Sequence, residues 1–99
     1  ELDKLHNPNF TALALALRRA DFQNRHALEV ASFKQRAAIP ALVLALHDQR
    51  APVRRLALWG LSEMRFQETA AVIAIMLNDQ DPFVRAEAAR ALGDFAPRH

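Results

Sequence analysis

One segment of the chain occurs twice, 31 positions apart. The stretch NDQDPFVRAEAARALGDF covers residues 78–95, and a looser copy, HDQRAPVRRLALWGLSEM, covers residues 47–64. When the copies are superposed, identical residues coincide at Asp48 and Asp79, Gln49 and Gln80, Val53 and Val84, Arg54 and Arg85, Ala57 and Ala88, and Leu61 and Leu92. A period near 30 residues, with two helical patterns in each unit, is typical of an α-solenoid.

The apolar residues of each copy recur at helical spacing. One face is formed by Val53, Ala57, Leu61 and Met64, and the equivalent face by Val84, Ala88, Leu92 and Phe95. Over the whole chain the pattern predicts six helices, at about 9–19, 22–33, 38–47, 52–64, 69–77 and 82–95. The run at 11–17 also alternates like a strand, but its Ala and Leu residues favour a helix.

The expected turns between these helices are short, so consecutive helices should run antiparallel. We therefore expect an all-α fold, a solenoid of about three stacked antiparallel helical hairpins. The last helix should begin with Asp81 as its N-cap and Pro82 at its first position. The segments Leu42 to Leu46 and Val72 to Leu77 are apolar on nearly every side. They should be covered on two faces, by their own hairpin partner and by the adjacent repeat.

Composition supports a packed domain and narrows its chemistry. Hydrophobic residues make up 52% of the 99 residues, with 2 Gly and 5 Pro, which argues against disorder. Cysteine is absent, which excludes disulfides and thiolate sites and fits a reducing compartment, so we expect a cytoplasmic location. The longest apolar run, residues 37–46, is too short to span a membrane.

We divide the chain into a leader at 1–8, a single repeat domain at 9–95 and a tail at 96–99. The first residue is not Met and the helices run almost to the C-terminus, which indicates a piece of a longer protein. Terminal repeats usually need a polar outer face. The last helix has one polar side, formed by Glu87, Arg90 and Asp94. We expect this polar side to cap the C-terminal end of the solenoid. An end without such a cap would be covered by self-association or by the remainder of a larger polypeptide.

The pattern D-x-D-P-x-V-R-x-x-A-x-x-A-L-G at Asp79 to Gly93 strongly resembles a HEAT repeat. It is most similar to the HEAT-like type described in phycobilisome bilin lyases, specifically over 36–95 and more weakly over 9–33. The resemblance implies right-handed stacking of hairpins into a curved ribbon, whose inner face commonly binds a protein partner. It does not imply lyase activity, because the repeat occurs in many proteins that never touch a bilin.

Charged residues at matching repeat positions predict a polar ladder. Asp48 and Asp79 lie in equivalent turns, and Arg54 and Arg85 lie in equivalent first helical turns. We expect carboxylate–guanidinium pairs between repeats, with the aspartates also accepting backbone N–H bonds. The alternative is that the two arginines bind a phosphate or an acidic partner.

No pattern in the sequence indicates catalysis. The four histidines, at positions 6, 26, 47 and 99, show no metal-binding spacing. The His-Glu dipeptides that ligate iron in HEAT-repeat deoxyhypusine hydroxylases are absent, as are Gly-rich phosphate loops and Cys or Tyr nucleophiles. We therefore expect no catalytic residues, no metal and no cofactor.

One irregularity suggests a contact surface. Leu56 and Trp59 replace the charged Glu87 and Arg90 of the next repeat, positions expected to face solvent. An apolar pair at such positions, with Arg55 beside it, indicates a protein-binding site. The competing interpretation is that Trp59 packs on the first hairpin or on a segment outside this chain.

These features predict a non-catalytic protein–protein interaction or scaffold module. One alternative is a nucleic-acid-binding domain, similar to HEAT-like DNA glycosylases with a basic concave surface. Its arginines would be Arg18, Arg19, Arg50, Arg54, Arg55 and Arg65, with Trp59 and Asp48 or Asp79 near the lesion. The net charge of +2 is small for such a surface. Another alternative is a subunit of the bilin lyase type.

Overall fold

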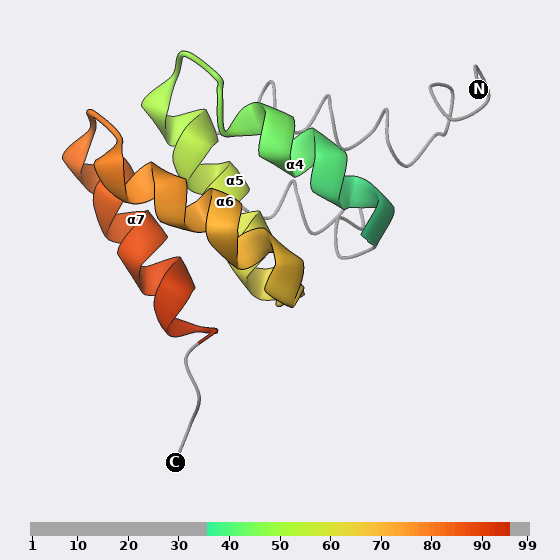
Figure 1. Ribbon diagram of the computed structural model, residues 1–99. Coiled ribbons are helices and arrows are strands. Elements are labelled where there is room, and N and C mark those ends of the chain that lie inside the picture. Colours follow the sequence, from blue (N-terminus) through green and yellow to red (C-terminus); the bar gives the residue numbers. More distant parts are fainter. Residues whose placement is uncertain (1–35, 96–99) are drawn as a thin grey trace, which may run out of the picture.

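The computed structural model describes residues 36–95 (Figure 1). These residues form four α-helices and no strand: α4 (Ile39–Ala45), α5 (Ala51–Met64), α6 (Ala70–Ile75) and α7 (Pro82–Gly93). Short 3-10 turns are η2 (Arg36–Ala38), η3 (Gln67–Thr69) and η4 (Met76–Asn78). The predicted all-α class is confirmed here. The helices expected at 9–19 and 22–33, the leader and the tail lie outside the described residues.

Local sequence signals explain where these helices begin and end. Asp81 caps α7 as predicted, because its side chain accepts hydrogen bonds from the N–H groups of Phe83 and Val84. Helix α5 ends at Met64, and the following residue, Arg65, adopts a left-handed conformation with φ of 57°. Helix α6 is shorter than the predicted 69–77, because 3-10 turns replace α-helical bonding at both of its ends.

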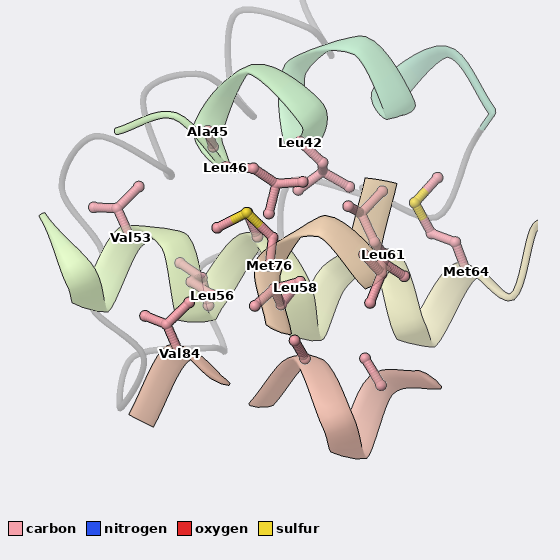
Figure 2. Close-up of a cluster of buried hydrophobic side chains, with 14 of the residues drawn as sticks. Leu42, Ala45, Leu46, Val53, Leu56, Leu58, Leu61, Met64, Met76 and Val84 are labelled. Carbon is pink, nitrogen blue, oxygen red and sulfur yellow. The ribbon is translucent and has the colours of Figure 1, made fainter. Parts of the chain in front are cut away.

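Helix α5 lies at the centre of the packing. It packs against α4 on one side and α7 on the other, while α7 also contacts α6 and η4 (Figure 1). The side chains with no exposed surface include Leu42 of α4, Leu61 of α5, Ile73 of α6 and Val84 of α7. Figure 2 shows that Leu42 of α4 and Leu46, which directly follows α4, point toward α5 and Met76. One core therefore joins all four helices. Full burial of each such aliphatic side chain stabilises the fold by about 1.5–3 kcal/mol.

The structure corrects the expectation that Leu56 is exposed. Leu56 has 0% of its surface exposed and lies in the core beside Val53 and Leu58 (Figure 2). Its repeat partner Glu87, also expected to face solvent, is only 6% exposed. The reason is that α5 is an internal helix and buries two sides, so most of its circumference is covered.

Substitution of Leu56 by Ala should therefore destabilise the fold. We expect Leu56→Ala to lower the free energy of unfolding by about 2–5 kcal/mol, because it leaves a cavity in the core. Leu44→Ala removes the same atoms from a side chain that is 72% exposed, and should change stability by about 0.5 kcal/mol or less. Urea denaturation followed by circular dichroism measures both, and equal losses would contradict the buried position of Leu56.

Candidate functional site

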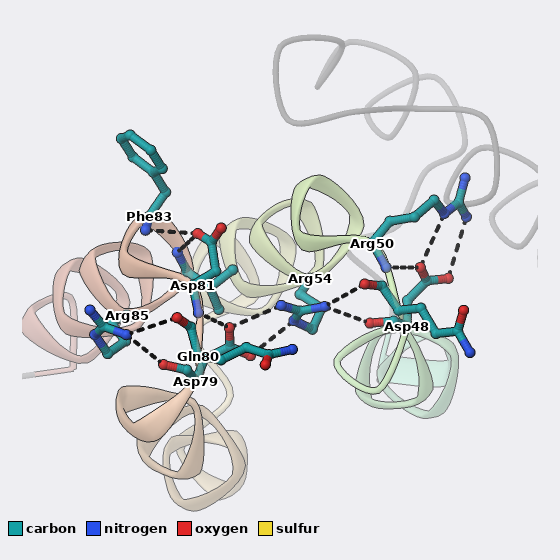
Figure 3. A network of polar contacts seen from close by, with 10 residues as sticks. Asp48, Arg50, Arg54, Asp79, Gln80, Asp81, Phe83 and Arg85 are labelled. Carbon is teal, nitrogen blue, oxygen red and sulfur yellow. Dashed lines mark hydrogen bonds and ion pairs between the residues drawn. The ribbon is translucent and has the colours of Figure 1, made fainter.

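A buried ion pair joins the two copies of the repeat. Arg54, in the first turn of α5, donates from Nε to Oδ1 of Asp79 over 2.9 Å and from Nη2 to Oδ2 over 3.0 Å (Figure 3). The two side chains are 8% and 9% exposed. Both bonds run in parallel, which is the geometry that matches a guanidinium to a carboxylate. This pair is one rung of the kind of ladder expected from the sequence.

The third nitrogen of Arg54 holds the turn before its own helix. Nη1 donates to the carbonyl oxygens of Asp48 at 2.9 Å and Gln49 at 3.0 Å. One guanidinium therefore connects the turn that precedes α5 with the turn that precedes α7. Because Asp79 Oδ2 also accepts the N–H of Asp81 at 2.9 Å, the carboxylate is satisfied on both oxygens.

The carboxylate of Asp48 bonds within its own turn. It accepts the backbone N–H of Arg50 at 2.8 Å and the Arg50 Nε at 3.1 Å. Arg54 thus reaches Asp48 through the carbonyl oxygen and not through the carboxylate. In the described part of the chain, the pairing of aspartate and arginine between repeats is made by Arg54 and Asp79 alone.

These contacts shift the titration of both aspartates. The side-chain and backbone hydrogen bonds from Arg50 lower the pKa of Asp48 below its ordinary value of 3.8. Burial alone would raise the pKa of Asp79. Hydrogen bonds from the Arg54 side chain and the Asp81 N–H, with the nearby guanidinium charges, outweigh burial and lower the pKa of Asp79 below 3.8.

A second polar link between α5 and α7 was missed in the sequence. Arg90 of α7 donates to the hydroxyl of Ser62 on α5 at 3.0 Å, and its Nε donates to Glu87 at 2.8 Å. Arg90 also pairs with Asp94 at 3.1 Å. The polar side predicted for the last helix is therefore one connected network, and part of it faces α5. Ser62 carried no signal because a lone serine in a helix does not identify its partner.

The residues predicted to bind a partner do not form one exposed apolar patch. Leu56 belongs to the core, and Trp59 is half-buried and packs against that core. The guanidinium of Arg55 lies 5.4 Å from the ring centre of Phe83 on α7. A partner-binding role for Trp59 and Arg55 stays a prediction.

An exposed apolar surface lies instead on α4 and α6. Leu44 is 72% exposed and Ile75 is 67% exposed, and they occupy equivalent repeat positions 31 residues apart. Pro40 and Ala71, one turn earlier in each helix, are exposed as well. We call these four residues the exposed apolar row. We expected both helices to be covered on two faces, and Leu44 and Ile75 lie on a side of each helix that stays exposed.

The surroundings of the row carry little net charge. At the beginning of α4 and α6, Arg36 forms an ion pair with Glu68, which joins the two repeats across the surface. The Arg36 guanidinium also lies 4.2 Å from the ring centre of Phe66. Its charge is therefore matched locally, and the centre of the row is apolar.

The described residues contain no cluster of three or more His, Cys, Asp or Glu side chains that could hold a metal ion. None of the helices within 36–95 is long and apolar enough to cross a membrane.

Comparison with known proteins identifies the repeat. The family described as HEAT repeats matches residues 39–98, which is more than half of the chain. No curated protein and no solved structure matched the sequence. The matched region contains α4 to α7, the ion pair and the exposed apolar row.

Loss of the buried arginine should cost far more than loss of its exposed equivalent. We expect Arg54→Ala to lower the free energy of unfolding by about 3–5 kcal/mol, because the Asp79 carboxylate stays buried without its partner. Arg85→Ala removes two exposed hydrogen bonds to carbonyl oxygens and should cost about 1 kcal/mol or less. Urea denaturation compares the two, and losses of similar size would disprove the special role of Arg54.

The lowered pKa of Asp79 predicts a pH dependence with a definite sign. The contribution of its charged form is fully present above the unfolded value of 3.8 and is lost as pH falls through the lower folded value. The stability difference between the wild type and Asp79→Asn should therefore be constant near neutral pH and shrink below about pH 4. Urea denaturation at a series of pH values measures this difference in the free energy of unfolding. Asp48→Asn is the comparison, with a smaller neutral-pH loss because its partner Arg50 is exposed.

Proposed function

The chain belongs to the HEAT repeat family, and we propose that it is a non-catalytic module that binds a protein partner through the exposed apolar row. HEAT repeats are generally protein-interaction scaffolds, and that general role is the starting point. The observation that carries the proposal is the exposure of Leu44 and Ile75 at equivalent positions of successive repeats.

Two exposed aliphatic side chains in register are costly to leave in water and suited to a contact. Transfer of apolar surface out of water contributes about 25 cal/mol per Å². Leu44 and Ile75 lie on helices whose other faces are already anchored in the core through Leu42 and Ile73. The surface is therefore held in place before binding, which reduces the ordering cost of association.

The charges around the row support an apolar protein segment as the partner. Arg36 is neutralised by Glu68, and the members of the row that follow these two residues in the sequence are Pro40 and Ala71. A polar or acidic ligand would meet no unmatched charge at the centre of this surface. The apolar stripe of a helix from another protein matches it, because such stripes bind grooves and faces of this kind.

The described arginines give less support to a nucleic-acid surface. Arg54 is buried against Asp79, and Arg90 is bonded to Glu87 and Asp94. Phosphate binding needs cationic groups that are not already paired, because their charge displaces the counterions condensed on the nucleic acid. No feature of residues 36–95 favours a bilin lyase over a general scaffold.

The proposed role of the exposed apolar row can be tested by replacing its aliphatic side chains with charged ones. We expect the double variant Leu44→Asp and Ile75→Asp to keep its helical circular dichroism spectrum and lose partner binding, because both substitutions are on exposed side chains. Partners captured from host lysate with nuclease present should then be purified, and their affinity for the double variant should fall at least about 30-fold, the loss expected for hot-spot side chains.

Phe83→Asp is the matched control, since Phe83 is 64% exposed but lies on α7 and outside the row. Binding that survives in Phe83→Asp and is lost in the double variant supports the proposal. A purified partner that the folded double variant still binds with wild-type affinity would exclude the row as the binding surface.

A further inference from the structure

The exposed apolar row forms the middle of two longer exposed stripes. Exposed positions recur on α4 and on α6, including the turns at their ends, at spacings of three, four and three residues, which places them on one face of each helix. The stripe of α4 comprises positions 37, 40, 44 and 47, and the stripe of α6 comprises the equivalent positions 68, 71, 75 and 78. Figure 1 shows that α4 and α6 run in the same direction, so the two stripes begin and end together.

The two ends of these stripes differ in their polar groups. Where both helices begin, Glu68 is already paired with Arg36, whose guanidinium also lies over the ring of Phe66. At the other end, the exposed side chains are those of His47 and Asn78. Within the described part of the chain, neither of these two side chains makes a hydrogen bond or an ion pair. One end of the apolar row is therefore satisfied internally, and the other end offers polar groups to a ligand.

An amphipathic helix that lies along the stripes matches this order of residues. The members of the row lie one turn apart, at 40 and 44 on α4 and at 71 and 75 on α6, and the apolar residues of an amphipathic helix recur at the same spacing. Val43 and Val72, which neighbour the row in the sequence, are half-buried and pack against the core. The apolar centre of the stripes is therefore firmly supported from below.

The open end of the stripes is suited to the first turn of such a helix. The first four N–H groups of a helix have no partner within it and carry partial positive charge. The amide oxygen of Asn78 and a ring nitrogen of neutral His47 are acceptors for these groups. Helix α4 ends beside His47, and η4, which continues α6, ends at Asn78. The partial negative charge of both helix ends attracts the same donors.

We propose that the partner segment is an amphipathic helix that lies along both stripes, antiparallel to α4 and α6, with its first turn at His47 and Asn78. Its apolar side would cover the exposed apolar row, and its free N–H groups would donate to these two side chains. The opposite direction would bring the carbonyl end of the helix against the carbonyl ends of α4 and η4, where like partial charges repel. This inference rests on the proposed function, because it assigns a direction and a polar contact to the same surface.

The test uses the whole chain and a synthetic helical probe. The probe is a peptide of about 15 residues, long enough for a helix to form in water. It carries leucines three and four residues apart on one face, with alanine, lysine and glutamate in balanced numbers elsewhere. Both of its ends are blocked, so that terminal charges do not contribute. Its dissociation constant is measured by NMR titration of the isotope-labelled chain.

Two substitutions of Asn78 report the direction of the bound probe. Asn78→Asp keeps the acceptor and adds negative charge, whereas Asn78→Lys offers only donors and adds positive charge. We expect Asn78→Asp to bind the probe at least as tightly as the wild type, and Asn78→Lys to bind it about 3- to 10-fold more weakly, the loss typical of a helix-capping contact. Gln80→Asp and Gln80→Lys are the matched controls, because Gln80 is an exposed amide nearby that lies outside the stripes. They should change the affinity little.

A spin label measures the direction independently of charge. The chain contains no cysteine, so Ala37→Cys provides a single attachment site for a nitroxide at the beginning of the α4 stripe. The proposal predicts that the label broadens the NMR signals of the last residues of the probe more than those of its first residues. The reverse gradient would overturn the antiparallel direction. Equal broadening at both ends would indicate a helix that crosses the stripes and would also overturn the inference.

The outcomes separate this inference from the proposed function. A probe that binds the wild type and is lost in the double variant Leu44→Asp and Ile75→Asp, but prefers Asn78→Lys to Asn78→Asp, overturns the inference and leaves the row as a binding surface. A probe that does not bind the wild type at millimolar concentration also overturns the inference, since a helix is then the wrong occupant. A probe that binds the double variant as tightly as the wild type contradicts both proposals.

Discussion

The pair of Arg54 and Asp79 is the contact on which the arrangement of the two repeats depends. Apart from this pair and the bond from Arg90 to Ser62, the buried side chains of α5 and α7 are mostly small or aliphatic, such as Ala57 and Ala88. Such side chains pack acceptably at more than one offset along the helix axis. A bidentate ion pair is satisfied at one offset only. Removal of two charges from water offsets much of their attraction, so we interpret the pair as a register-setting contact more than as a source of net stability. The bonds from Arg54 to the carbonyl oxygens of Asp48 and Gln49 also fix the turn before α5 relative to this pair.

The consequence of this register is an internal helix and two kinds of surface. Because α5 is held between α4 and α7, its apolar positions on two sides, including Leu56 and Leu58, become core. The outer sides of α4 and α6 receive no such cover and keep Leu44 and Ile75 in water. The two repeats place these side chains in a row because they share one period. The repeat period that places equivalent side chains in the core therefore also places equivalent side chains on the surface proposed to bind a partner.

The repeat also explains why two arginines with the same motif have different energetic roles. Arg54 is covered because a further repeat stacks beyond it, and Arg85 is exposed because α7 has no described helix on that side. Burial turns the same guanidinium into a contact whose loss leaves an unpaired charge. The exposed guanidinium of Arg85 instead makes only two weakly stabilising hydrogen bonds to carbonyl oxygens. The environment, and not the residue, sets the value of each contact.

The sequence by itself determined the features that depend on local chemistry and on the period. These include the helical class, the Asp81 cap and the equivalence of positions 54 and 85, because hydrophobic spacing and capping residues act within one helix or turn. Only the tertiary structure decided which sides of each helix are covered. It buried Leu56 and Glu87, which the comparison of copies placed in solvent, and it exposed Leu44 and Ile75, which apolar composition placed inside. The physical reason is that burial is a property of neighbouring helices, and a repeat pattern specifies equivalent positions without specifying what lies against them.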